Sequence, residues 1–77
     1  MSYDQIIDEI LSYAKMQQQK DVNGEYKINI NSLLKHFEKK FPELDSRPIY
    51  DMIDEIDARG WLLKRDSAIL VFDPASF

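Results

Sequence analysis

The chain has 77 residues, which is the length of one small domain, and its net charge is −4. Hydrophobic residues make up 44% of the chain and charged residues 31%, so the composition is that of a folded globular domain and excludes an intrinsically disordered one. There is no cysteine, which excludes disulfides, thiolate nucleophiles and zinc–thiolate sites.

The first predicted element is a helix that begins after Ser2 and ends near Gln18. Ser2 and Gln5 have the spacing of a capping box, in which each residue's side chain accepts from the other's backbone N–H. Apolar side chains then recur at helical spacing, at Ile6, Ile7, Ile10, Leu11 and Ala14. The Asp-Val-Asn-Gly sequence at residues 21–24 predicts a turn.

A short strand and a second helix are expected next. Residues 26–30 alternate apolar and polar side chains, as in a strand with one buried face. Asn31 is the expected N-cap of the helix, and Pro42 ends it. The apolar side of this helix has Leu33, Leu34 and Phe37, and the solvated side has Lys35, Lys39 and Lys40.

A third helix and a hairpin complete the chain. Asp45 and Ser46 are candidate N-caps of the helix, and Pro48 fits its first turn. Its apolar face has Ile49, Met52, Ile53 and Ile56, and Gly60 is the expected C-terminal stop. Residues 61–64 and 68–72 predict two strands around a turn at residues 65–67, closed by Asp73 and Pro74.

This order of elements resembles the winged helix-turn-helix family. The resemblance is closest between Leu44 and Leu62, where apolar residues four and seven positions after Ile49 precede a glycine eleven positions after it. These positions are Ile53, Ile56 and Gly60, and Trp61 and Leu62 open the wing. The resemblance implies one α+β domain over residues 1–77, with three helices, a short strand after the first helix and a C-terminal β-hairpin wing. The motif is structural, so it implies a fold and leaves the function open.

The third helix argues against the base-reading role that DNA-binding members of this family give to it. In those members the third helix lies in the major groove. The outward positions here are Arg47, Tyr50, Asp51, Asp54, Glu55, Asp57 and Ala58. Four carboxylates would face phosphates, and the counterion release that drives DNA binding would be missing. Pro48 also removes a backbone N–H from the start of the helix, where phosphates often bind.

We therefore expect a regulatory interaction module that binds a protein with a basic surface, or a second copy of the chain. The expected contact residues are Tyr50, Asp51, Asp54, Glu55 and Asp57. An exposed tyrosine beside charged residues is typical of interface hot spots. A merely solvated acidic face is the competing interpretation.

The alternative function is that of a small transcriptional regulator that binds DNA as a dimer. Its phosphate contacts would come from the start of the third helix, the wing tip and the second helix, at Arg47, Lys64, Arg65, Lys35, Lys39 and Lys40. A third interpretation is that the domain is one piece of a larger assembly.

The sequence predicts no enzyme, metal site, cofactor or small-molecule substrate. His36 is the single histidine and is expected at or near the surface. The adjacent acids Asp8-Glu9 and Asp54-Glu55 do not share a helix face, and there is no glycine-rich phosphate loop. No apolar run approaches the ~20 residues of a membrane span. With acidic residues near the N-terminus and no signal peptide, a cytoplasmic protein without membrane contact is expected.

Overall fold

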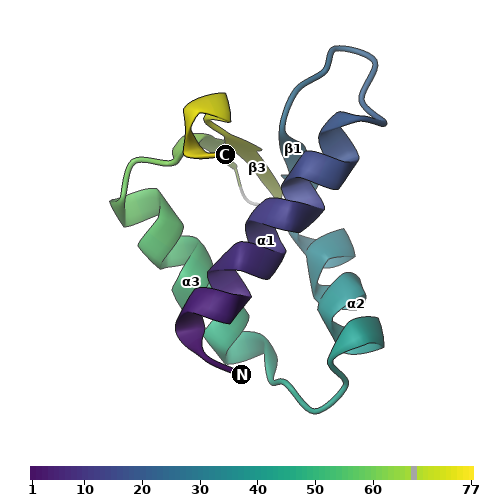
Figure 1. The fold of residues 1–77 in the computed structure, drawn as a ribbon, viewed down its shortest axis with the longest axis vertical. Helices are drawn as coiled ribbons and strands as arrows, with labels where there is room; N and C mark the ends of the chain where they lie inside the picture. Colours follow the sequence, from purple (N-terminus) through teal and green to yellow (C-terminus); the bar gives the residue numbers. More distant parts are fainter. Residues whose placement is uncertain (67) are drawn as a thin grey trace.

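The computed structural model describes residues 1–66 and 68–77, which form an α+β fold (Figure 1). The expected order of three helices and three strands is confirmed. The helices are α1 (Tyr3–Gln18), α2 (Ile30–Lys40) and α3 (Ser46–Ala58), and the strands are β1 (Lys27–Asn29), β2 (Leu62–Arg65) and β3 (Ile69–Phe72). A 3₁₀ turn, η1 (Pro74–Ser76), follows the last strand and was not expected.

Capping interactions fix the starts of the first two helices. The Ser2 hydroxyl accepts from the Gln5 N–H at 3.3 Å, and the Ser2 N–H donates to Gln5 Oε1 at 2.8 Å, so the predicted capping box is confirmed. The prediction that Asn31 caps α2 is wrong. Asn29 is the cap, and its Oδ1 accepts from the N–H groups of Asn31 (2.8 Å) and Ser32 (3.3 Å). The physical reason is that β1 ends at Asn29, opposite Ile69 of β3, and the Ile30 N–H still donates to Ala68 O at 2.8 Å while Ile30 already begins the helix, so Asn31 lies inside α2.

The three strands form one antiparallel sheet in the order β1-β3-β2. Leu70 lies opposite Ile28 of β1 and Arg65 of β2, and the register of the second pair shifts between Leu62 and Lys64. Arg65, expected in the turn, therefore belongs to β2. Ser67, the last residue of the predicted turn, lies outside the described residues.

The core brings together the apolar faces of all three helices and the inner face of the sheet. In Figure 1, α1 lies between α2 and α3, and the sheet lies near the C-terminal end of α3. The helical stripes predicted from sequence are confirmed as core, except that Leu11 and Leu34 are only half-buried. The fully enclosed side chains include Ile6, Ile10, Leu33, Phe37, Ile49, Ile53, Ile56, Leu70 and Phe72. No helix within residues 1–66 and 68–77 is long and apolar enough to cross a membrane.

Gly60 ends α3, as predicted, by adopting a left-handed backbone conformation. Its φ is 77°, and the backbone around it donates back into the helix, from Gly60 N to Asp57 O at 3.0 Å and from Trp61 N to Ile56 O at 3.2 Å. Glycine tolerates this conformation at little steric cost. The cap directs the chain from α3 into β2, so it sets the orientation of the hairpin relative to the helix.

We expect Gly60→Ala to lower the free energy of unfolding by about 1 kcal/mol, because a residue with a Cβ atom disfavours the left-handed backbone conformation. A Cβ at this position would meet no atom within 4 Å, so the loss comes from backbone strain alone. Gly60→Asn is the matched control and should lose less, because asparagine tolerates this conformation. Urea unfolding followed by circular dichroism measures both variants. Equal losses in the two would contradict the backbone explanation.

Candidate functional site

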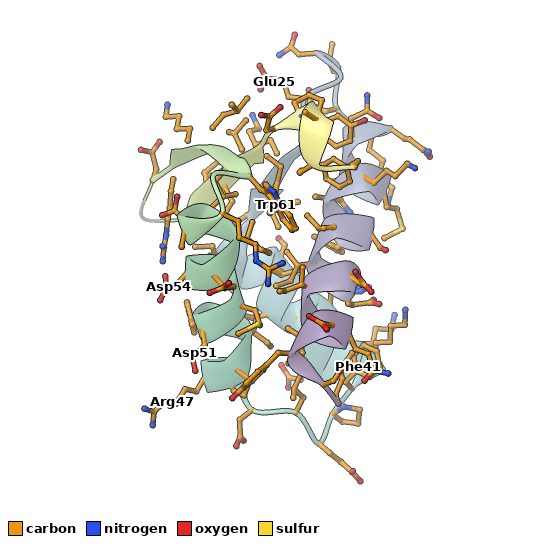
Figure 2. The ribbon with its side chains drawn as sticks, turned by 60° about the vertical axis from the view of Figure 1, so that its left-hand side comes forward. Glu25, Phe41, Arg47, Asp51, Asp54 and Trp61 are labelled. Carbon is orange, nitrogen blue, oxygen red and sulfur yellow. The ribbon has the colours of Figure 1, made fainter. Side chains whose placement is uncertain are left out.

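The predicted partner-binding side chains lie together on the solvent side of α3, opposite its buried isoleucines. We call this set the acidic face; it comprises Tyr50, Asp51, Asp54, Glu55 and Asp57, and all five are exposed. Figure 2 shows Arg47, Asp51 and Asp54 along the outer edge of the helix, pointing away from α1. Tyr50 is 41% exposed, so part of its ring is open to solvent.

Two guanidinium groups of the chain itself bind the C-terminal half of this face. Arg65 of β2 reaches two carboxylates, with Nη2 2.6 Å from Asp54 Oδ1 and Nη1 3.4 Å from Asp57 Oδ2. The hydrogen bond to Asp54 is the main cause that raises the pKa of Arg65, and it outweighs the opposing effect of burial. Arg59 Nε lies 3.1 Å from Glu55 Oε1, one helical turn earlier. These carboxylates are therefore partly neutralised within the fold.

Trp61 supports the Arg59 side chain. The guanidinium carbon of Arg59 lies 5.1 Å from the centroid of the Trp61 ring, within the range of a cation–π interaction. Figure 2 shows Trp61 between α1 and α3, near the C-terminal end of α3. The tryptophan is half-buried and packs against the core, so it gives Arg59 a fixed surface beside Glu55.

The N-terminal half of the acidic face is different. Within the part of the chain that the structure describes, Arg47 and Asp51 are exposed and take part in none of the ion pairs. Asp45 precedes the helix as its N-cap but makes no side-chain capping hydrogen bond. Arg47, Tyr50 and Asp51 therefore present one positive, one aromatic and one negative side chain to solvent on adjacent turns.

The six cations proposed for DNA binding do not share one surface. Lys35 and Lys39 are exposed on α2, which Figure 1 shows on the other side of α1 from α3. The ammonium group of Lys40 binds Glu9 at 2.9 Å, and that of Lys64 lies 3.4 Å from Asp66. Lys40, Lys64 and Arg65 are thus paired with carboxylates of the chain, while Arg47 lies at the start of α3.

A charged cluster between α1 and α2 was not predicted from sequence. His36 Nε2 lies 2.8 Å from Glu9 Oε1, and an ionised carboxylate only accepts, so the imidazole N–H donates. Lys40 Nζ donates to the same oxygen at 2.9 Å, and the Tyr13 ring packs on the imidazole with 4.6 Å between centroids. His36 is half-buried, in agreement with the prediction. The cluster ties α2 to α1.

The cluster changes the acidity of Glu9. Burial raises the pKa of this carboxyl, but the hydrogen bonds from His36 and Lys40 and the attraction of their charges lower it below its ordinary value of 4.5. Among residues 1–66 and 68–77, no group of three or more histidine, cysteine and carboxylate side chains could hold a metal ion. The arrangement is that of a structural ion pair.

Two hollows of the surface lie away from the acidic face. One of about 490 Å³ lies between the start of the chain and the α2–α3 connection. It is lined by Met1, Lys40, Phe41, Pro42, Glu43 and Leu44, and Figure 2 shows Phe41 near the start of α1. A hollow of about 260 Å³ between α2 and α3 includes Ser46 and Ile49 but none of the acidic-face residues.

Comparison of the chain with protein-family models, with curated proteins and with solved structures found no match.

We expect Glu9→Gln to destabilise the fold by about 1 kcal/mol at neutral pH, because it removes the charge that His36 and Lys40 bind. A carboxyl with a lowered pKa stabilises the folded state above its unfolded pKa, and this contribution disappears as the pH falls through the folded pKa. The difference in free energy of unfolding between wild type and variant should therefore decrease below pH 4.5, the ordinary pKa of this carboxyl.

Chemical unfolding between pH 3 and 7 measures that difference. Asp8→Asn is the matched control, since Asp8 is the neighbouring exposed carboxylate and takes part in no ion pair of the described residues. It should change stability little at any of these pH values. A difference for Glu9→Gln that does not depend on pH would show that packing, rather than charge, makes the contribution of Glu9.

Proposed function

We propose that this chain is a non-catalytic winged helix-turn-helix module that binds a protein partner with a basic surface through the acidic face of α3. The winged-helix arrangement is supported by the element order and by the sheet order β1-β3-β2, in which the C-terminal hairpin follows α3 through Gly60. In this arrangement α3 is the helix that other members of the family use for recognition.

The observation that carries the proposal is the charge of the solvent side of α3. Four exposed carboxylates lie there, and the described cations paired with them are Arg59 and Arg65. Arg47 also lies on this side, so the four carboxylates exceed the three arginines by one negative charge, which is accompanied by the exposed ring of Tyr50. A basic protein surface would be attracted to this charge over several ångströms, and the tyrosine supplies contact area at low entropic cost.

DNA is the less favourable partner for this face. Phosphates would approach Asp51 and Asp54 directly, and Arg65 would have to leave two carboxylates before it could bind a phosphate. The exposed Lys35 and Lys39 remain a candidate phosphate-binding pair on α2. A second copy of the chain is the other protein partner that the acidic face admits, with these lysines as its basic surface.

We expect Asp51→Lys to weaken partner binding about fivefold or more, the equivalent of roughly 1 kcal/mol, because the variant repels a basic surface. Asp51 takes part in no ion pair of the described residues, so the internal contacts of α3 stay intact. Proteins retained by the immobilised chain would be quantified by mass spectrometry, with sedimentation of the free chain to detect self-association.

Asp8→Lys is the control for this experiment, since it changes the net charge equally but lies on α1. A partner retained by Asp8→Lys and lost with Asp51→Lys supports the proposed face. If both variants reduce the binding of a partner equally, or if neither reduces it, the acidic face is excluded as the binding site.

The proposal also requires that duplex DNA binds poorly. We expect no saturable change in the anisotropy of a labelled duplex at low salt with chain concentrations of about 50 μM, a range in which even non-specific DNA-binding proteins saturate. Binding that weakens steeply with added salt, and that is lost in the Lys35→Glu, Lys39→Glu double variant, would instead establish the DNA-binding alternative.

A further inference from the structure

The Arg65 guanidinium occupies part of the surface that the proposed partner would use. Asp54 and Asp57 lie three residues apart on α3, so their carboxylates are neighbours on one side of the helix. The two nitrogens Nη1 and Nη2 of one guanidinium reach both of them, at 3.4 and 2.6 Å. This forked contact is the geometry that favours arginine over lysine for recognising paired carboxylates.

Apolar contacts do little to hold this end of the hairpin. The four residues that follow Leu62 are exposed; Leu63 as a whole is 63% exposed and the side chain of Lys64 66%. Arg65 is therefore the charged link between the far end of β2 and α3. An ion pair of this kind on the surface is weak enough to be exchanged, because water and added charges compete with it.

The two carboxylates also remain accessible while Arg65 is bound. The side chain of Asp54 is 61% exposed and that of Asp57 46%. A second cation can approach them from solvent and compete with Arg65 for the same oxygens. A second guanidinium that makes the same forked contact would lie against the guanidinium of Arg65, and the repulsion between the two cations opposes their binding together, so the second group competes with Arg65 for the pair.

We propose that Arg65 is an internal competitor that closes the Asp54–Asp57 pair until an arginine side chain of the partner displaces it, and that displacement releases the exposed end of β2, residues 63–66, from α3. This rests on the proposed function and names the group that the acidic face recognises. Arg65 also makes binding selective, because only a partner with a guanidinium in the right position can bind both carboxylates. Arg65 thus lowers the affinity for basic surfaces in general.

The test compares Arg65→Gln with Lys64→Gln. Both variants remove one positive charge from adjacent positions of β2, but Lys64 pairs with Asp66 and not with α3. The probe is a blocked tetra-arginine peptide, titrated at low salt into the isotopically labelled 77-residue chain, with the backbone amide shifts of residues 50–58 as the readout. Arg65→Gln should bind the peptide about threefold more tightly than wild type, because the competing group is gone.

Lys64→Gln controls for the change of net charge and should stay close to wild type. Arg65→Lys is a second variant that keeps the charge but not the fork, and its affinity should lie between those of wild type and Arg65→Gln. Release of the end of β2 should appear as faster backbone motion of residues 63–66, both in Arg65→Gln and in wild type saturated with peptide. Circular dichroism confirms that each variant is folded.

The other possible results contradict either the competition by Arg65 or the binding by the acidic face. Equal gains in Arg65→Gln and Lys64→Gln would show a general effect of charge and overturn the internal competitor. Equal affinity of wild type and Arg65→Gln, with α3 amides still shifted, would overturn the competitor and leave the proposed function intact. If the α3 amides shift in neither protein, the acidic face does not bind a basic group, and both proposals fall.

Discussion

The burial of one side of α3 is the constraint from which the rest of the site follows. Ile49, Ile53 and Ile56 are at most 2% exposed and pack in the same core as α1 and the sheet. Removing three such side chains from water stabilises the fold by several kcal/mol, at roughly 1.5–3 kcal/mol for each. This stabilisation is much larger than the repulsion among surface carboxylates, so the core fixes the rotation of the helix and Asp51 and Asp54 must face solvent.

Where the sequence predicted structure well, the information was local. The apolar spacing in α1 and α3 identified the core side of each helix, the Ser2–Gln5 pair identified the first cap, and Gly60 identified the end of α3. Each of these features depends on residues within a few positions of one another. The exposure of the acidic face followed from the same spacing, since a residue outside the apolar stripe has to lie on the other side.

Apart from the local turn η1, the features that the sequence did not predict depend on interactions between different segments of the chain. The cap of α2 is Asn29 and not the predicted Asn31, because pairing with β3 determines where β1 ends. The bonds from His36 to Glu9 and from Arg65 to Asp57 join residues 27 and 8 positions apart. No spacing rule links such residues before the fold brings them together. The Glu55–Arg59 pair, four residues apart on one helix, is the ion pair that spacing could have predicted.

The direct passage from β1 into α2 has a further consequence for the tolerance of the chain to change. Asn29 is the last residue of the strand and also the cap of the helix, so no loop residue separates the two elements. One residue inserted there would turn α2 by about 100° relative to the sheet and carry Leu33 and Phe37 out of the core. By contrast, the segment between α1 and β1 is largely exposed, with Val22 at 99%, and can absorb changes in length. Variation in length among natural or engineered forms of this domain should therefore concentrate in residues 19–25 and spare the strand–helix junction.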